Sequence, residues 1–488
     1  MFILTNYDIP LQHKTNKIMR AQILTCIMLF SGTIAYAQEA FTLEQCRQLA
    51  IENNKELKIS SAKIKMSEED HSAAHTKYYP QISANGSYMR NQKGINLVDF
   101  DELSSLSSLL PMLDPLIQGN PEAAQALQVA ANDIKNATHL DVRNVWIGNI
   151  SLVQPVFMGG KISSYNRITA YAKELAQSMN ATQLEGVIYK TDEAYWQVVS
   201  LANKKRLADL YVEMLKRTDN DMTAMINEGF ATKAEGLSVK VRLNEAEIAQ
   251  TKVDNGLALS RMLLAQLCGI ELNSLIKLAD ENTSSFSNSY ATVFPDVNKA
   301  FANRHELKTL ELVTKIYKKK EDVVIADMLP NVALTANYIV MNPNSYNGFK
   351  NKFGGMYNIG MMVNVPLTGW WEGMHKKNSA RAETLIKQLE YEEAREKIEL
   401  EVNQSAYKVN EAIKQLNASI RNMEKAEENL RYANIGFKEG VIPSLNLMEA
   451  QTAWFAAQVQ LIDAHIEVKL TKAYYTLTLA LALVDEGL

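Results

Sequence analysis

The feature that most restricts the fold of this chain is a heptad pattern that runs unbroken through a long C-terminal segment. Its bulky track is Val402, Val409, Leu416, Met423, Leu430 and Phe437, and its mostly small track is Ile398, Ser405, Ala412, Ser419, Ala426 and Ala433. Large side chains beside small ones allow knobs-into-holes packing at a short interhelical distance. A helix from His375 to Phe437 would be about 95 Å long, which exceeds any compact domain. The pattern predicts extended coiled coils rather than an ordinary bundle core.

The heptad pattern resumes after Gly440, and one track of the same spacing runs from Val187 to Met222 in the first half of the chain. Each half is therefore expected to form a helical hairpin, with its tip near Gly229 or near Gly440. With 21 glycines and 11 prolines, the chain is poor in helix breakers. This scarcity favours long helices over a loop-rich all-β fold.

Self-comparison indicates an internal duplication. Asn53, Glu56-Leu57-Lys58 and Pro80 recur 250 residues later as Asn303, Glu306-Leu307-Lys308 and Pro330. Both halves have the same predicted order of helix, strand pair and helical hairpin. We expect a first structural repeat at residues 38–290 and a second at 291–488. The first repeat carries an extra acidic, proline-containing segment at 92–143, which we interpret as a long exposed loop between strands.

Four segments, near 81–88, 146–152, 331–340 and 357–365, alternate apolar and polar residues. Any one of them alone would suit a half-buried strand of a soluble sheet. Their shared Asn, Ser and Thr faces and their aromatic ends favour membrane strands with lipid on one side and water on the other. The predicted lipid-facing residues are Tyr88, Trp146, Ile150, Leu334, Tyr338, Ile359 and Val363. Four strands cannot close a barrel, so membrane strands would require the chain to oligomerise.

The N-terminus has the parts of a secretory signal. Arg20 precedes the apolar run Ile23–Phe30, and Ala35-Tyr36-Ala37 supplies a cleavage site, so residues 1–37 are predicted to be removed. The leader is long, which makes Met19 an alternative start. The run is too short for the competing interpretation, a transmembrane anchor. Export would leave only Cys46 and Cys268, which form no disulfide framework and are expected to be buried thiols.

The sequence carries no sign of an active site. The net charge of −4, from 51 basic and 55 acidic residues, disfavours nucleic-acid binding. His71 and His75 have half of a zinc-site spacing but lack a third ligand, and are expected on a solvated helix face. Gly159-Gly160-Lys161 lacks the upstream glycine of a phosphate-binding loop. We therefore expect no catalytic residues, no metal and no cofactor.

The order of helix, strand pair and long hairpin, repeated once, resembles the TolC-like outer-membrane efflux proteins over about residues 40–484. Phe41-Thr42-Leu43, Gln154-Pro155-Val156-Phe157 with the following Gly-Gly-Lys, and the two glycine-led tips resemble recurrent blocks of that family. The resemblance implies a mainly α fold with membrane β-strands. Three chains would share one β-barrel in the outer membrane of a diderm bacterium, and their helices would form a periplasmic tunnel.

The resemblance also implies a function. The chain would be the homotrimeric, passive outer-membrane channel of a tripartite efflux or type I secretion system, bound to a periplasmic adaptor and an inner-membrane transporter. Gly229, Glu235 and Gly440 would mark the tips that dock the adaptor. The family closes its tunnel with acidic residues at positions that hold Asn446 and Glu449 here, so one acid is retained and one is an amide. A periplasmic adaptor or tether is the alternative, although adaptors normally carry one hairpin within β-rich modules.

Overall fold

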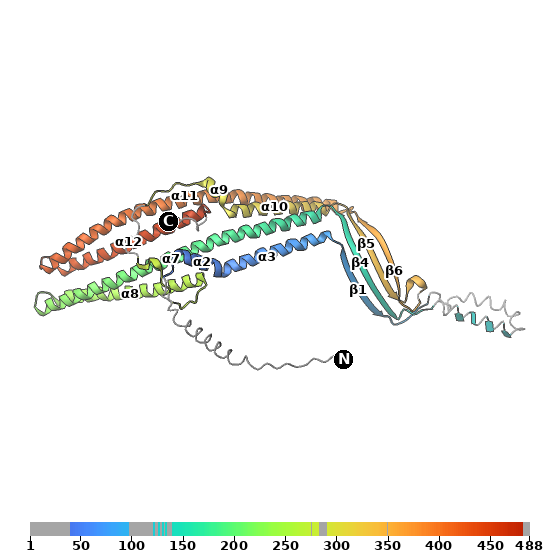
Figure 1. Ribbon diagram of the computed structural model, residues 1–488, viewed down its shortest axis with the longest axis horizontal. Helices are drawn as coiled ribbons and strands as arrows, with labels where there is room; N and C mark the ends of the chain where they lie inside the picture. The colour runs from blue at the N-terminus through green and yellow to red at the C-terminus, as the bar shows by residue number, and fades with distance from the viewer. Residues whose placement is uncertain are drawn as a thin grey trace, which may run out of the picture. The chain divides into compact units, whose positions relative to one another are not determined.

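A computed structural model describes residues 40–481 apart from 97–120, 123–124, 127–128, 131, 134–138, 275, 283–289 and 349. The predicted signal peptide and most of the segment 92–143 lie outside the described residues. The chain forms two compact units, and Figure 1 labels the helices and strands that belong to them. The hairpin unit comprises Met1–Lys55, Leu184–Asp296 and Glu401–Leu488, and the sheet unit comprises Glu56–Gln183 and Val297–Leu400.

The sheet unit contains a four-stranded antiparallel sheet in the order β1-β4-β5-β6. The strands are β1 (Gln81–Arg90), β4 (Asn144–Met158), β5 (Asn331–Asn342) and β6 (Gly354–Asn364), and they confirm the four strands expected from the alternating pattern. The short strands β2 (Ile95–Asn96) and β3 (His139–Leu140) pair with each other. Strand β4 continues through Pro155, where its register with β5 shifts. A bulge is where a sheet tolerates proline, which has no amide hydrogen to donate.

Each strand of the sheet is connected along the chain to one long helix. Helix α3 (Lys55–His75) and the 3-10 turn η1 (Thr76–Tyr78) precede β1, and α7 (Lys161–Asn227) follows β4. Helix α9 (Val297–Asn303) and α10 (His305–Ala326) precede β5, and α11 (Gly369–Lys438) follows β6, with η3 (Ser345–Asn347) between the two strands. The chain thus connects β1 to α3, β4 to α7, β5 to α10 and β6 to α11.

Side-chain hydrogen bonds join the helical segments in the order α3-α7-α10-α11. Asn166 Nδ2 of α7 donates to Ala74 O of α3 at 3.1 Å, and Ser178 Oγ donates to His305 O of α10 at 2.8 Å. Arg381 Nε of α11 donates to Glu321 Oε1 of α10 at 2.8 Å. Each helical segment thus keeps the neighbours of the strand to which the chain connects it.

The hairpin unit contains α2 (Leu43–Asn53), α8 (Lys233–Cys268), η2 (Ala279–Asn282), α12 (Ser444–Thr478) and the C-terminal parts of α7 and α11. The α7–α8 and α11–α12 hairpins confirm the predicted coiled coils. At 70 residues, α11 is about 105 Å long. The bulky track is buried at Val402, Val409 and Leu416, and the small track is buried at Ala412 and Ser419, whereas Ala426 is half-buried.

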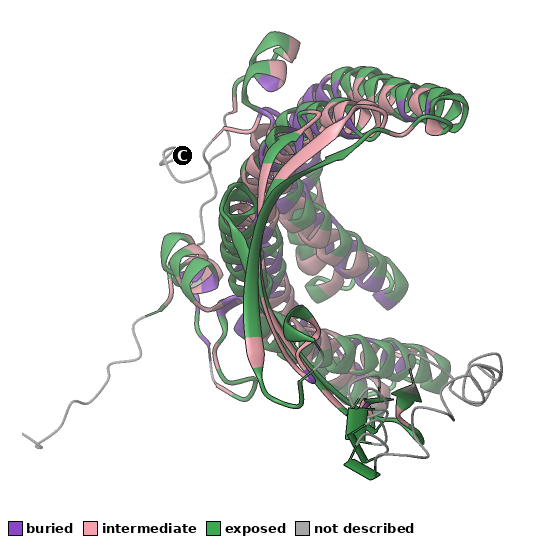
Figure 2. Cartoon of the chain, turned by 90° about the vertical axis from the view of Figure 1, so that its right-hand side faces the viewer, coloured by how far each residue is buried: buried purple, intermediate pink, exposed green. Residues whose placement is uncertain are grey.

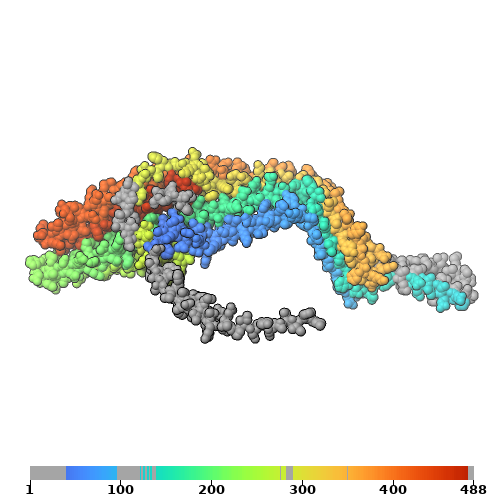
Figure 3. All heavy atoms as spheres, viewed as in Figure 1, coloured from blue at the N-terminus to red at the C-terminus, as the bar shows by residue number. Residues whose placement is uncertain are grey.

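The two hairpins pack against each other through side chains of α7, α8 and α12 (Figure 3). The ring of Tyr211 in α7 stacks on Phe455 in α12, with 4.4 Å between centroids. Met222, Val239 and Met448 form a second shared cluster near the tips, with Phe437 packed against it. The hairpins are therefore one packed assembly within this unit.

Small side chains of α11 pack against α12 within the second hairpin. Ala412 lies in one buried cluster with Ala464 and Val468 of α12. Ala412→Leu should lower the free energy of unfolding by about 1–3 kcal/mol, because the added carbons overpack this seam. Ala412→Ser is the matched control, since buried serines already occupy the track at Ser405 and Ser419. Equal thermal unfolding curves for Ala412→Leu and the unchanged protein would show that this seam does not limit helix spacing.

The internal duplication is confirmed by the order of elements. Helices α2 and α3, strands β1 and β4, and helices α7 and α8 recur as α9 and α10, β5 and β6, and α11 and α12. The boundary that we place between residues 290 and 291 stays a prediction.

Candidate functional site

One face of the sheet carries the residues predicted to contact lipid. Tyr88 lies opposite Trp146, and Ile150 lies opposite Tyr338. Directly opposed residues of antiparallel strands share a face, and alternate residues along a strand do too. The register therefore gathers all seven candidates on one face: Tyr88, Trp146, Ile150, Leu334, Tyr338, Ile359 and Val363. Their exposed fractions in the single chain run from 46% at Leu334 to 78% at Ile359. Figure 2 shows that the strands of the sheet are coloured mostly as exposed or intermediate.

The opposite face carries a polar row that crosses all four strands. Ser83 lies opposite Ser151, Ser151 opposite Asn337, and Asn337 opposite Asn358. The Oγ atoms of Ser83 and Ser151 are 2.7 Å apart, and Asn337 Nδ2 donates to Asn358 Oδ1 at 2.9 Å. The sequence identified each polar strand face, but the alignment of these residues into one row depends on strand register.

The sheet also has two open edges. Within the described residues, β1 pairs only with β4, and β6 pairs only with β5. Three successive antiparallel pairings separate β1 from β6, so the two edge strands run in opposite directions. An edge of this kind can accept a strand from another chain.

The first hairpin tip turns at Gly229 and restarts at a capping box. Gly229 has φ +79°, which suits glycine at the end of α7, and Phe230 N donates to Met225 O at 2.8 Å. Thr232 N donates to Glu235 Oε2 at 2.7 Å, and Glu235 N donates to Thr232 Oγ1 at 3.3 Å. The backbone amide and then the hydroxyl of Thr232 lower the pKa of Glu235. The Thr-x-x-Glu spacing was a readable sequence signal for this cap.

Removing this cap should loosen the start of α8. Thr232→Ala is expected to destabilise the first turn by about 1 kcal/mol, because one helix amide loses its acceptor. Hydrogen exchange at Glu235 and Gly236 measures the effect. Glu235→Gln is the matched control, because glutamine also completes a capping box. Since the folded-state pKa of Glu235 is lowered, the contribution of its carboxylate is present near neutral pH and is lost as the pH falls through that pKa.

The second tip places both predicted constriction residues on an exposed surface. Gly440 has φ +69°, and Pro443 occupies the position before α12. Asn446 and Glu449 are exposed, whereas Leu447 and Met448 between them are 3% and 6% exposed. Asn446 and Glu449 are three residues apart on the helix and so share a face. That face points away from the hairpin core and is available for a neighbour or for solvent.

The groove between α11 and α12 and the histidines of α3 are further candidate sites. A groove of about 510 Å³ between α11 and α12 is lined mainly by charged and amide side chains, among them Lys408, Glu411 and Asp463. No group of three or more His, Cys, Asp and Glu residues suited to a metal ion occurs in the part of the chain that the structure describes. His71 is half-buried and its Nδ1 lies 3.0 Å from Thr169 Oγ1, so the expectation of a solvated face is wrong for His71.

The helices of residues 40–481, over the positions that are described, include none with the length and apolar character needed to span a membrane.

Among the solved structures with the same fold are three outer-membrane proteins. The outer-membrane channel OprN matches with a TM-score of 0.72 and 14% identity over 90% of each chain. The CmeC outer membrane channel of Campylobacter jejuni matches with a TM-score of 0.72 and 13% identity, over 98% of this chain and 94% of CmeC. The outer membrane protein VceC of Vibrio cholerae matches with a TM-score of 0.69 and 13% identity, over 90% of this chain and 96% of VceC. No curated protein sequence matches significantly.

The sequence itself matches the outer membrane efflux protein family over residues 46–270 and 297–482. These ranges cover most of the chain and include both hairpins and all four strands of the sheet. The match favours an efflux channel over a periplasmic adaptor. The chain belongs to the outer membrane efflux protein family.

Proposed function

We propose that three copies of this chain form a passive channel through the outer membrane, with the long helices as a tunnel in the periplasm. The observation that carries the proposal is the four-stranded sheet, which has an apolar aromatic face, a polar face and two open edges. Lipid offers no hydrogen bonds to a sheet edge, so such a sheet is compatible with a bilayer only when its edges are paired.

Three copies resolve the edge problem. Each contributes four strands, and β6 of one chain can pair antiparallel with β1 of the next because these edge strands run in opposite directions. The result is a twelve-stranded barrel with an even strand number, as in bacterial outer-membrane barrels. Tyr88, Ile150 and Leu334 would then contact lipid, and the row from Ser83 to Asn358 would face the water-filled lumen.

The proposed channel has no catalytic step of its own. An inner-membrane transporter would supply the energy, and a periplasmic adaptor would dock at the tips around Gly229 and Gly440. Family membership supports this division of labour. The carboxylate of Glu235 is poorly suited to bind the adaptor, because it already accepts hydrogen bonds from the backbone amide and the hydroxyl of Thr232.

The constriction at the second tip can be tested by charge removal. If the trimer brings three copies of Glu449 close to its axis, they attract cations, since a ring of carboxylates selects for positive ions. Glu449→Gln should therefore reduce cation selectivity and weaken block by a trivalent cation added at the periplasmic side, both measured in planar bilayers. Glu235→Gln is the control and should change both less. Equal block before and after Glu449→Gln would exclude Glu449 from the constriction.

The channel itself is tested by fractionation and conductance. Expressed in a diderm host, the protein should sediment with outer membranes, and the purified protein should open ion-conducting pores in planar bilayers. A protein that stays in the periplasmic fraction as a monomer, without conductance, would contradict the proposal. It would favour the alternative function, a periplasmic adaptor or tether.

A further inference from the structure

The fold brings together two cysteines that are far apart in the sequence. Cys46 lies in α2, and Cys268 is the last residue of α8, 222 positions further along the chain. Both belong to one buried cluster and are 2% and 0% exposed. Cys268 Sγ lies 3.6 Å from the backbone oxygen of Cys46. The third cysteine of the chain, Cys26, falls in the predicted leader, so the exported chain would hold only these two.

The segments around the two cysteines are closely joined. Phe41 N donates to Lys277 O at 2.9 Å, and Ala279 N donates to Phe41 O at 3.0 Å, which ties the chain before α2 to the segment after α8. At the other end of α2, Asn53 Nδ2 donates to Cys268 O at 3.4 Å. A Cβ added at Gly269 would overlap the side chain of Asn53. The contact between Cys46 and Cys268 is therefore held from both ends of α2.

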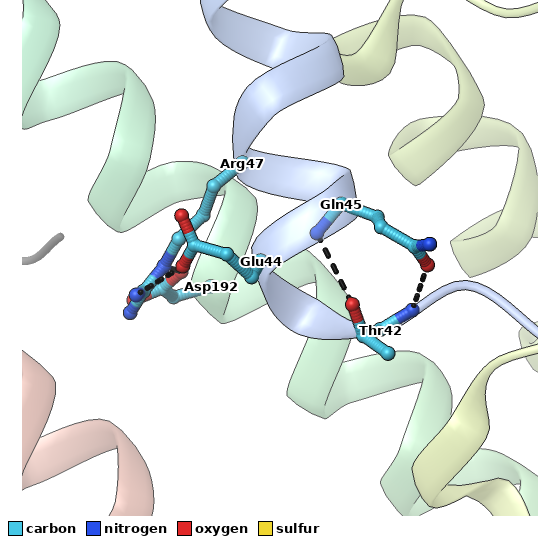
Figure 4. Close-up of polar contacts among 5 residues, drawn as sticks. All are labelled: Thr42, Glu44, Gln45, Arg47 and Asp192. Carbon is cyan, nitrogen blue, oxygen red and sulfur yellow. Dashed lines mark hydrogen bonds and ion pairs between the residues drawn. The ribbon is translucent and has the colours of Figure 1, made fainter. Parts of the chain in front are cut away.

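Helix α2 is also fixed to α7. The capping box of Thr42 and Gln45 begins the helix, and the Arg47 guanidinium forms a paired contact with the Asp192 carboxylate, with both N–O distances 2.7 Å (Figure 4). These contacts hold α2 in one position against α7 within the hairpin unit. The structure holds both cysteines as free, buried thiols, next to each other within this fixed part of the hairpin unit.

We propose that Cys46 and Cys268 are joined by a disulfide in the exported protein. The proposal rests on the proposed function in one respect, because disulfides persist in the periplasm and are rare in the cytosol. The two thiols together lose two protons and two electrons. The oxidant is a protein disulfide of the compartment: one thiolate attacks it to give a mixed disulfide, and the second thiolate displaces the oxidant as a dithiol.

Burial decides when this oxidation occurs. Contact with the Cys268 thiol and burial together raise the pKa of Cys46, whereas the hydrogen bond with Cys46 lowers the pKa of Cys268, so it is access rather than ionisation that limits oxidation of the folded pair. An external oxidant cannot reach side chains that are 2% and 0% exposed. The bond therefore forms before α2 closes onto α8 and is afterwards protected from reductants. It closes a loop that contains β1, β4 and the first hairpin, which restricts the unfolded chain.

The alternative is a pair of reduced thiols that pack as small apolar side chains. Thiol counting separates the two. The full-length protein is purified from outer membranes with N-ethylmaleimide present, denatured, and labelled with a second maleimide before and after reduction. We expect no label on Cys46 or Cys268 before reduction and one on each after it, with the two cysteine peptides linked in the unreduced digest. Two labels without reduction would overturn the proposal.

A mutant cycle gives an independent readout. If one bond links the residues, Cys46→Ser, Cys268→Ser and the double variant should lower the thermal unfolding midpoint by the same amount, because each removes the same bond. Separate contributions that add in the double variant would contradict the disulfide. The cellular location of the protein is scored separately: two free thiols in an outer-membrane channel reject only the disulfide, whereas linked cysteines in a protein outside the outer membrane reject only the channel.

Discussion

Replacing Asp192 by alanine should lower the free energy of unfolding of the hairpin unit by about 3–5 kcal/mol, because the Arg47 guanidinium would lose its buried carboxylate partner. The side chains of Arg47 and Asp192 are 12% and 1% exposed. Burial raises the pKa of Asp192, and its hydrogen bonds from Arg47 oppose that rise. The expected result is earlier loss of helical circular dichroism on heating or in denaturant.

Glu44 provides the matched control. Its carboxylate lies 3.3 Å from Arg47 Nη1, but its side chain is 60% exposed. Glu44→Ala should therefore change stability by less than about 1 kcal/mol. Replacing both buried partners, as in Arg47→Met with Asp192→Leu, should recover much of the loss, because no charge is then left unpaired in the core. Equal effects of Asp192→Ala and Glu44→Ala would mean that burial does not strengthen this ion pair.

Placing a charge on the apolar face of the sheet should prevent membrane insertion. Leu334→Arg is expected to destabilise the inserted barrel by about 2–4 kcal/mol per chain at mid-depth, with a smaller effect toward the interfaces. Val363→Arg, on β6, tests the same face at a second strand. The measurement is the amount of protein that reaches the outer membrane and resists extraction.

Thr335→Arg is the control for both substitutions. Thr335 neighbours Leu334 on β5, and adjacent residues of a strand point to opposite faces. An arginine at position 335 would stay in the water-filled lumen, so insertion should be normal. If Leu334→Arg and Thr335→Arg insert equally well, the assignment of the two faces is wrong.

Local periodicity accounts for the parts of the fold that were predictable. The heptad tracks from Val402 to Phe437 specify a long helix by themselves, and alternation specifies β5 from Val332 to Val340. The periodic pattern did not specify where the helices end. Helix α11 begins at Gly369, six residues before the predicted start near His375. Its first turn was missed because Trp370 and Trp371 carry no heptad signal, and Pro366 marks the end of the extended segment before it.

Contacts between distant segments were not predictable in the same way. Cys46 meets Cys268, and Arg47 meets Asp192, only after α2 packs on α8 and α7. The polar row from Ser83 to Asn358 requires the register of three strand pairs. Single-sequence periodicity carries no information on such pairings, because it describes each segment by itself.

The candidate sites were likewise predictable only where the local sequence specifies them. Gly229 and Gly440 were readable as hairpin tips, because a left-handed backbone conformation at a helix end favours glycine. The roles of Asn446 and Glu449 depend on neighbouring chains, so one chain gives their exposure and their shared helix face but not what they meet.

Native mass spectrometry of the full-length protein extracted from outer membranes counts the chains that share one barrel. We expect a complex of three copies, because one four-stranded sheet with two open edges cannot close alone, whereas three such sheets supply a barrel. A single chain that remains folded in the membrane extract, or a dimer as the only assembly, would contradict the shared barrel and with it the proposed channel.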